Sequence, residues 1–210
     1  MELRTKILEA AARVYSQHGF RGATTRLIAQ EADVNEVTLF RTFGSKEALI
    51  EEAIRTCAES AAFAQLPAEP EDPERELTAW CAAHMAHIRQ SRPLIVSCMA
   101  EIDTRPEVAC GAARGPHRAW AELSRYLGRL RDKGLMDPDV HLNAAGSMFM
   151  SAAFGDAMGR EMIPEMFPKP LEDAAREYTR VFLRAIEPSE PRTKRRNNRD
   201  AAARNTSTDN

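Results

Sequence analysis

The sequence predicts an all-α fold, in which a small N-terminal helix-turn-helix domain of three helices precedes a larger helical domain. Apolar residues recur at spacings of three and four in one segment after another, and no segment alternates apolar and polar residues as a strand would. Residues that start and stop helices lie between these segments. With 43% hydrophobic residues among 210, the chain can build one sizeable core or a small domain on a larger one.

The first expected helix ends at Gly19, a residue type that commonly terminates helices. Its apolar stripe is Leu3, Ile7, Leu8, Ala11, Val14 and Tyr15. This helix should supply the surface on which the following short helices pack.

Three helix starts then follow closely. Thr24 or Thr25, Asn35 and Ser45 are residue types whose side chains accept hydrogen bonds from the first N–H groups of a helix. They predict a second helix to about Ala32, a third through Phe43 and a fourth from Lys46 to about Ala64. Two short helices with only a tight turn between them match a helix-turn-helix, whose second helix enters the DNA major groove.

The third helix has two distinct faces. Leu39 and Phe43 are four residues apart, so they share one side and can anchor the helix to its domain. The outward set is Glu36, Val37, Thr38, Arg41 and Thr42. It mixes donors, an acceptor and methyl groups, which are the groups that read base edges. Periodicity alone leaves a plain amphipathic helix with a solvated face equally open.

The residues of this segment resemble the N-terminal domain of TetR/AcrR-family transcriptional regulators. The matching motifs are Gly19-Phe20, Thr24-Thr25-Arg26, Ile28-Ala29, Asp33-Val34, Thr38-Leu39-Phe40, Phe43 and Ser45-Lys46-Glu47. They are specific in combination and cover about the first quarter of the chain. The resemblance implies a homodimeric regulator, most often a repressor, that binds a palindromic double-stranded DNA operator and responds to a small effector.

The resemblance also implies which residues lie at the DNA. These are Thr25, Arg26, Asn35, Glu36, Val37, Thr38, Phe40, Arg41, Thr42 and Lys46. Arg26 and Arg41 are candidates for reading a base, since Arg can pair with guanine O6 and N7, and Arg26 could equally contact a phosphate. Two positions depart from the family pattern: Phe40 replaces a usual Tyr, and Asp33 replaces the usual turn Gly. Asp tolerates the left-handed conformation, so we expect the turn to survive.

The rest of the chain predicts further helices. Asp72-Pro73 is a helix start after the Pro- and Glu-rich loop from residue 66. The expected helical segments are an apolar stripe from 77 to 88, a stretch at 94–102 that is apolar nearly all round and so buried, one from about 120 closed by Gly134, one from Asp137-Pro138 to about 158, and one at 171–186. Breaks are expected at 105–115 and 159–170.

The resemblance implies an effector pocket among the middle helices, and soft Met and aromatic side chains suit an apolar ligand. The candidates are Trp80, His84, Met85, Met99, Trp120, Met148 and Phe149. Residues of these types are more often plain core, and composition alone does not show a pocket. The last two helices carry a small-and-aromatic face that could form a four-helix dimer interface through Phe149, Ala153, Tyr178 and Phe182.

Composition limits the other function classes. The net charge of −2 gives no general affinity for nucleic acid, so basic groups must gather on one face. No run approaches the ~18 apolar residues of a membrane helix, and the start lacks a signal peptide, so we expect a cytoplasmic protein with no membrane partner. Four cysteines do not suggest a disulfide framework. Cys81, His84 and His87 invite a metal interpretation, but 87 is rotated away from 81 on a helix, so we expect neither metal nor cofactor.

We therefore expect a helix-turn-helix domain over 1–47, an effector-binding and dimerisation domain over 48–187, and a disordered basic tail over 188–210. The tail holds six Lys/Arg against three Asp/Glu. Two alternatives stay open: an effector-free DNA-binding dimer, and a helical enzyme, which no Ser/His/Asp set, phosphate loop or catalytic carboxylate pair supports.

Overall fold

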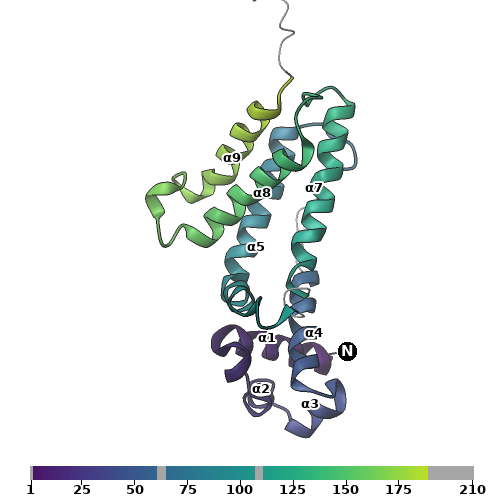
Figure 1. The fold of residues 1–210 in the computed structure, drawn as a ribbon, viewed down its shortest axis with the longest axis vertical. Coiled ribbons are helices and arrows are strands. Elements are labelled where there is room, and N and C mark those ends of the chain that lie inside the picture. The colour runs from purple at the N-terminus through teal and green to yellow at the C-terminus, as the bar shows by residue number, and fades with distance from the viewer. Residues whose placement is uncertain (1, 61–64, 107–110, 189–210) are drawn as a thin grey trace, which may run out of the picture.

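Every regular element in the part of the chain that the structure describes is helical (Figure 1). The structure is a computed structural model and describes residues 2–60, 65–106 and 111–188. The expected basic tail lies almost wholly outside these residues. The elements are α1 Glu2–Gly22, α2 Thr25–Glu31, α3 Glu36–Phe43, α4 Lys46–Ser60, α5 Pro73–Glu101, α7 Arg114–Asp132, α8 Leu142–Gly159, the 3-10 turn η1 Pro164–Met166 and α9 Leu171–Ile186.

The helices form two apolar cores. The first lies among α1 to α4 at one end of the molecule and is built around Ile7, Tyr15, Ile28, Leu39 and Ile50. Residues of α4 as far as Ile54 belong to it. The second lies among α5, α7, α8 and α9 at the other end (Figure 1).

Helix α5 joins the two cores, because it is long enough to reach both. Its 29 residues span about 44 Å at the α-helical rise of about 1.5 Å per residue. Leu77, Trp80 and Met85 lie in the second core, whereas Cys98 lies in the first. Asp72 caps its start by accepting a hydrogen bond from Arg75 N at 3.1 Å, as the sequence predicts.

One predicted helix boundary is confirmed and one is wrong. The regular geometry of the first helix is interrupted at Gly19, as predicted, and one further helical turn follows this kink to Gly22. The helix expected to start at Asp137-Pro138 begins at Leu142, because His141 Nδ1 accepts the hydrogen bond from Ala144 N at 3.3 Å. Asp137 N instead donates to the carbonyl oxygen of Ile186, which fixes this loop to the end of α9.

The segment 94–102 is also not buried on all sides. It is the last part of α5, and Val96, Met99 and Ile102 are about half exposed in the chain. Cys98 of this segment is buried in the first core, and partly buried Leu94 packs against it. A helix that packs on one neighbouring domain buries one face, so an apolar composition all round does not by itself predict burial.

Candidate nucleic-acid interface

Three side-chain caps define the helices that form this interface. Thr24 Oγ1 accepts a hydrogen bond from Leu27 N at 3.2 Å, and Asn35 Oδ1 accepts one from Val37 N at 2.9 Å. Ser45 Oγ accepts one from Ala48 N at 3.1 Å. The predicted starts of α2, α3 and α4 are therefore confirmed by the local chemistry on which they were based.

The turn between α2 and α3 depends on Asp33, whose φ of 51° is left-handed. Asp33 N donates to Gln30 O and Val34 N donates to Ala29 O, which satisfies two carbonyls that the end of α2 leaves free. This is the Schellman arrangement with Asp where Gly is usual. The tight turn that the sequence predicts is present, and it sets α3 across α2.

Helix α3 is anchored on one side and open on the other. Leu39 and Phe43 are buried in the first core, as predicted. Val37 and Phe40 are 62% and 49% exposed, and Arg41 and Thr42 are also exposed. Positions 37, 40 and 41 share one side of a helix, so α3 presents two apolar side chains and a guanidinium together.

Two of the predicted contacts are held inside the motif. Thr25 Oγ1 donates a short hydrogen bond to Glu36 Oε1, so these side chains tie the start of α2 to the start of α3. The Thr42 hydroxyl donates to the carbonyl oxygen of Thr38 at 2.7 Å. Glu36 therefore presents one fewer free acceptor atom to a base than its position on α3 suggests.

The cationic candidates differ in how they are held. Lys46 lies with Nζ 4.2 Å from the centre of the Phe20 ring, and Arg105 of the segment after α5 lies with Cζ 3.2 Å from the same ring. Arg26 and Arg41 are exposed, and within the described residues no hydrogen bond or ion pair engages either guanidinium. Arg26 and Arg41 are thus open to an external anion, whereas Lys46 rests on an aromatic face.

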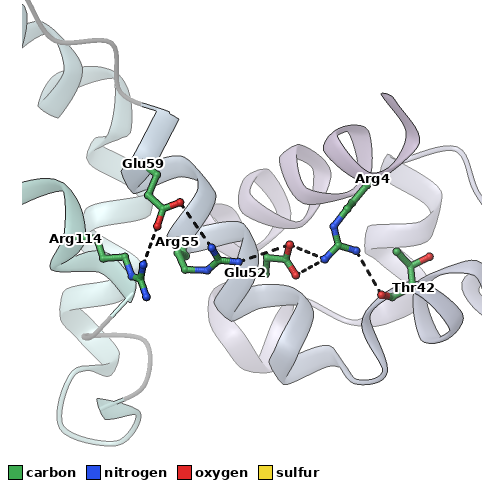
Figure 2. A network of polar contacts seen from close by, with 6 residues as sticks. All are labelled: Arg4, Thr42, Glu52, Arg55, Glu59 and Arg114. Carbon is green, nitrogen blue, oxygen red and sulfur yellow. Dashed lines mark hydrogen bonds and ion pairs between the residues drawn. The ribbon is translucent and has the colours of Figure 1, made fainter. Parts of the chain in front are cut away.

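Sequence reasoning missed the residues that hold α3 from behind (Figure 2). Arg4 of α1 donates to Thr42 O at 3.5 Å and places its guanidinium 4.5 Å from the centre of the Phe43 ring. Both oxygens of Glu52 accept from Arg4 at 2.6 Å. These partners are 38 to 48 residues apart, so no short-range sequence signal could have identified them.

The same set of charges continues along α4 to the start of α7. Arg55 lies 3.7 Å from both Glu52 and Glu59, and Arg114 at the start of α7 lies 2.9 Å from Glu59 (Figure 2). We call Arg4, Glu52, Arg55, Glu59 and Arg114 the α4 charge chain. It connects the C-terminal end of α3 with α7.

The predicted effector residues divide into two groups. Trp80, His84, Met85 and Phe149 are buried in or beside the second core, where the rings of Phe182, Phe149, Trp80 and His84 follow one another at centre distances of 4.6, 6.3 and 5.1 Å. Burial lowers the pKa of His84 to about 4, so this imidazole is neutral at pH 7. Trp120 is half-buried beside Gly146 of α8.

Met99 and Met148 do not join that cluster. They are 56% and 69% exposed, and each directly follows or precedes a buried residue, Cys98 or Phe149. Neighbouring helix residues point about 100° apart, so both methionines face away from the core. Both methionines lie outside the buried aromatic cluster, so their assignment to an effector pocket stays a prediction.

The predicted dimer residues also lie mainly inside the chain. Phe149, Ala153 and Phe182 are buried in the second core, and the Tyr178 hydroxyl donates to buried Asp156 at 2.8 Å. Arg160 also donates to Asp156. The predicted small-and-aromatic face is thus the inner face of α8 and α9, which leaves their outer faces for any partner.

The described residues contain no cluster of three or more His, Cys, Asp or Glu side chains arranged to hold a metal ion. Burial raises the pKa of the Cys81 thiol to about 12 and that of Cys98 to about 11, so both are protonated and unreactive at pH 7. Within the described ranges, no helix combines the length and apolarity needed to span a bilayer.

Comparison with known proteins agrees with this geometry. The profile of the family described as "Bacterial regulatory proteins, tetR family" matches residues 7–53, which contain the three caps and the whole of α3. The HTH-type transcriptional regulator YvkB of Bacillus subtilis is 25% identical over 182 residues, covering 86% of this chain and 95% of its own length. The HTH-type transcriptional repressor AcnR of Corynebacterium efficiens is 35% identical over 80 residues, covering 34% and 43%.

The solved structure of the flavonoid-responsive regulator FrrA shares the fold, with a TM-score of 0.69 at 22% identity over 90% of this chain and 99% of that one. The fold and interface therefore define a helix-turn-helix DNA-binding protein. The chain belongs to the TetR family, and it is a transcriptional regulator rather than an enzyme.

Proposed function

We propose that the protein is a cytoplasmic repressor that binds a palindromic operator as a homodimer and is released by a small apolar effector. DNA binding belongs to residues 1–47, and effector binding and dimerisation belong to residues 48–187. The observation that carries the proposal is the exposed side of α3, where Val37, Phe40 and Arg41 stand together on a helix anchored by Leu39 and Phe43.

This side of α3 carries the chemistry of direct base readout. The Arg41 guanidinium can donate two hydrogen bonds to guanine O6 and N7, and apolar Val37 and Phe40 can contact thymine methyl groups. Phe40 lacks the hydroxyl of the family's usual Tyr, so it contributes contact area and no hydrogen bond to a phosphate. The remaining predicted contacts at Thr25, Arg26 and Lys46 would position the motif on the backbone.

The test is selection of bound duplexes from a random pool by the purified protein. The wild type should enrich a palindrome whose half-sites are one helical turn, about 34–36 Å, apart. Arg41→Ala should relax the preference at one base pair in each half-site, whereas Arg125→Ala, at an exposed position of α7, should not. Unchanged preference in Arg41→Ala would assign this residue to the backbone or to solvent.

The outer face of α8 supports the homodimer. The helix has 18 residues, and its one charged side chain, Asp156, is buried. Met148 and Phe154 are exposed on it, and Val181 of α9 is 67% exposed. A helix face without charges is unusual on a protein surface, so we assign this face and Val181 to a four-helix contact between two subunits.

Val181→Arg tests this interface without touching the core. It should yield folded monomers in sedimentation velocity and weaken operator binding in a gel shift on the same sample. Ala121→Arg, on the exposed side of α7, is the matched control and should stay dimeric. A dimeric Val181→Arg protein with full operator affinity would place the interface elsewhere.

The aromatic row from Phe182 to His84 supports an apolar effector. It lies between α5, α8 and α9, so a flat ligand inserted beside Trp80 would displace α5 relative to its neighbours. Because α5 also packs on the first core, this displacement would be passed to the DNA-binding domain. A panel of flat aromatic and aliphatic compounds should contain one that quenches Trp80 or Trp120 and lowers operator affinity together. A panel that changes neither quantity would favour the effector-free dimer.

A further inference from the structure

Helix α1 is interrupted at Gly19 by a conformation that side chains rarely adopt. Gly19 has φ 62° and ψ −177°, a region occupied almost only by glycine. The helical ψ is about −42°, so the peptide between Gly19 and Phe20 is turned out of the helix direction. The helix then resumes for one turn, with Ala23 N donating to Gly19 O at 3.0 Å.

The kink separates two backbone groups that an uninterrupted helix would pair. In a regular α-helix, Phe20 N–H donates to the carbonyl oxygen of Ser16. Here Phe20 N donates to Glu101 Oε1 at 2.8 Å, and Ser16 O accepts from Ser97 Oγ at 3.1 Å. Ser97 and Glu101 are four residues apart, so they lie on one face of α5. This face therefore supplies a partner both to the Phe20 N–H and to the Ser16 carbonyl oxygen.

The same carboxylate and the residue after the kink reach the DNA-binding motif. Tyr15 donates its hydroxyl to Glu101 Oε2 at 3.2 Å, and Arg105 lies 4.0 Å from that oxygen. The Phe20 ring is placed between Arg105 and Lys46. Phe20 therefore connects the end of α5 with the first residue of α4.

We propose that Ser97 and Glu101 are positioning residues that hold α1 in the kinked form required for DNA binding. In the alternative form α5 withdraws, Phe20 N–H pairs with Ser16 O, and α1 straightens. Both forms satisfy the same two backbone groups, which makes the segment a two-state element. Straightening changes the direction of the segment 20–24. This segment leads directly into α2, so the helix-turn-helix is displaced.

This inference rests on the proposed function only for its consequence at DNA. The kink itself is tested by stability. Ser97→Ala and Glu101→Ala each remove one partner and should each lower the melting temperature. The double variant frees Phe20 N–H and Ser16 O to pair with each other, so its loss should be clearly smaller than the sum of the two single losses.

Gly19→Ala gives the sharpest test, because the sign of its effect on the melting temperature should differ between the wild-type background and the double-variant background. In the wild-type background Ala is strained at φ 62° and should lower the melting temperature. In the Ser97→Ala/Glu101→Ala background the straight helix is available, and Ala favours it over Gly, so the melting temperature should rise. Gly134→Ala is the control, since Gly134 has φ 72°, nothing lies within 4 Å of an added Cβ, and its effect should have one sign in both backgrounds.

The DNA consequence is measured on duplexes that the wild type selects. Glu101→Ala should lower affinity about tenfold, the scale of a typical coupling between sites, while Glu101→Gln, which keeps the acceptor oxygen, should restore most of it. A folded Glu101→Ala protein with wild-type affinity would overturn the proposal, as would additive losses and an unchanged sign for Gly19→Ala. If the wild type selects no duplex, the proposed function fails, and the melting temperatures still decide whether the kink is a two-state element.

Discussion

The two cores of this protein obtain their helices in different ways. In the first, α2, α3 and α4 are short, and each begins at a side chain that caps it: Thr24, Asn35 or Ser45. In the second, α7 and α9 are longer and begin without any side-chain cap. Side-chain caps therefore begin all three DNA-binding helices, whereas in the second core they begin α5 and α8 but not α7 and α9, which depend on the side chains that they bury.

The difference matches the two tasks. A recognition helix must present a fixed set of groups to solvent, so its ends are defined residue by residue and its outer side stays open. The second core buries a row of aromatic rings from α9 to α5, and its outer surface on α8 carries no charge. The proposed contacts with DNA thus lie on the locally determined part, and the proposed assembly and sensing lie on the part determined by packing.

The largest expected effect separates the two faces of α9. Phe182 is buried and stacks on Phe149 at 4.6 Å, whereas the adjacent Val181 is exposed. Phe182→Arg would bury an unpaired charge, so it should lower the free energy of unfolding by at least about 4 kcal/mol and abolish the second core. Thermal unfolding followed by near-ultraviolet circular dichroism should show this loss, while Val181→Arg keeps a cooperative transition. Equal stability of the two variants would mean that the face of α9 is assigned wrongly.

This pair of residues shows where the sequence stops being informative. Periodicity correctly identifies Phe149, Tyr178 and Phe182 as one apolar side of α8 and α9. It cannot say whether that side meets the same chain or another copy, because both environments are apolar. The same limit explains Met148, whose apolar character predicts burial, although its place on the helix turns it away from the core.

Acid should affect the second core more than the first. Burial lowers the pKa of His84 from an ordinary 6.5 to about 4, and burial also lowers the pKa of His87. Between pH 6.5 and 4 the histidine binds a proton in the unfolded chain but not in the folded protein. The contribution of neutral His84 to the free energy of unfolding is therefore fully present above pH 6.5 and is lost as the pH falls toward 4. The expected loss from His84 is about 3 kcal/mol.

His84→Phe keeps a ring against Trp80 and removes this titration. Urea unfolding at pH 7 and pH 4.5 should give a smaller difference for the variant than for the wild type. Identical differences would mean that His84 takes up its proton in the folded protein near its ordinary pKa.

A smaller effect is expected at the caps of the first core. Asn35→Ala removes the acceptor of Val37 N and should cost about 1 kcal/mol in unfolding free energy. Operator affinity should fall with it, because the first turn of α3 carries predicted base contacts. Asn143→Ala, exposed in the first turn of α8, is the matched control and should be neutral or slightly stabilising. A neutral Asn35→Ala would show that water replaces the cap.

The parts of the interface that could be predicted from the sequence are the locally determined ones. The caps, the buried pair Leu39 and Phe43, and the left-handed Asp33 could be predicted, because each depends on residues within a few positions. The distant residues that hold the helix-turn-helix in place could not be predicted. Glu101 is 81 residues from Phe20, and Glu52 is 48 residues from Arg4. Such contacts require the path of α4 and α5, which no local pattern contains.

The smallest expected effect concerns the α4 charge chain (Figure 2). The side chains of Arg4 and Glu52 are 46% and 23% exposed, so water screens their attraction. A double-mutant cycle with Arg4→Ala and Glu52→Ala should give a coupling of about 0.5 kcal/mol, and 1 M salt should reduce it.

Arg4→Ala alone should cost more than Glu52→Ala, because it also removes the contacts with Thr42 O and the Phe43 ring. If the ion pairs of the α4 charge chain act independently, a change at one end has no energetic effect at the other. Arg4→Ala and Arg114→Ala, at opposite ends, should then be additive within about 0.3–0.5 kcal/mol. A larger coupling between these two ends would mean that α4 transmits strain between the cores as one unit, and Glu101 would no longer be the main link between α5 and the DNA-binding motif.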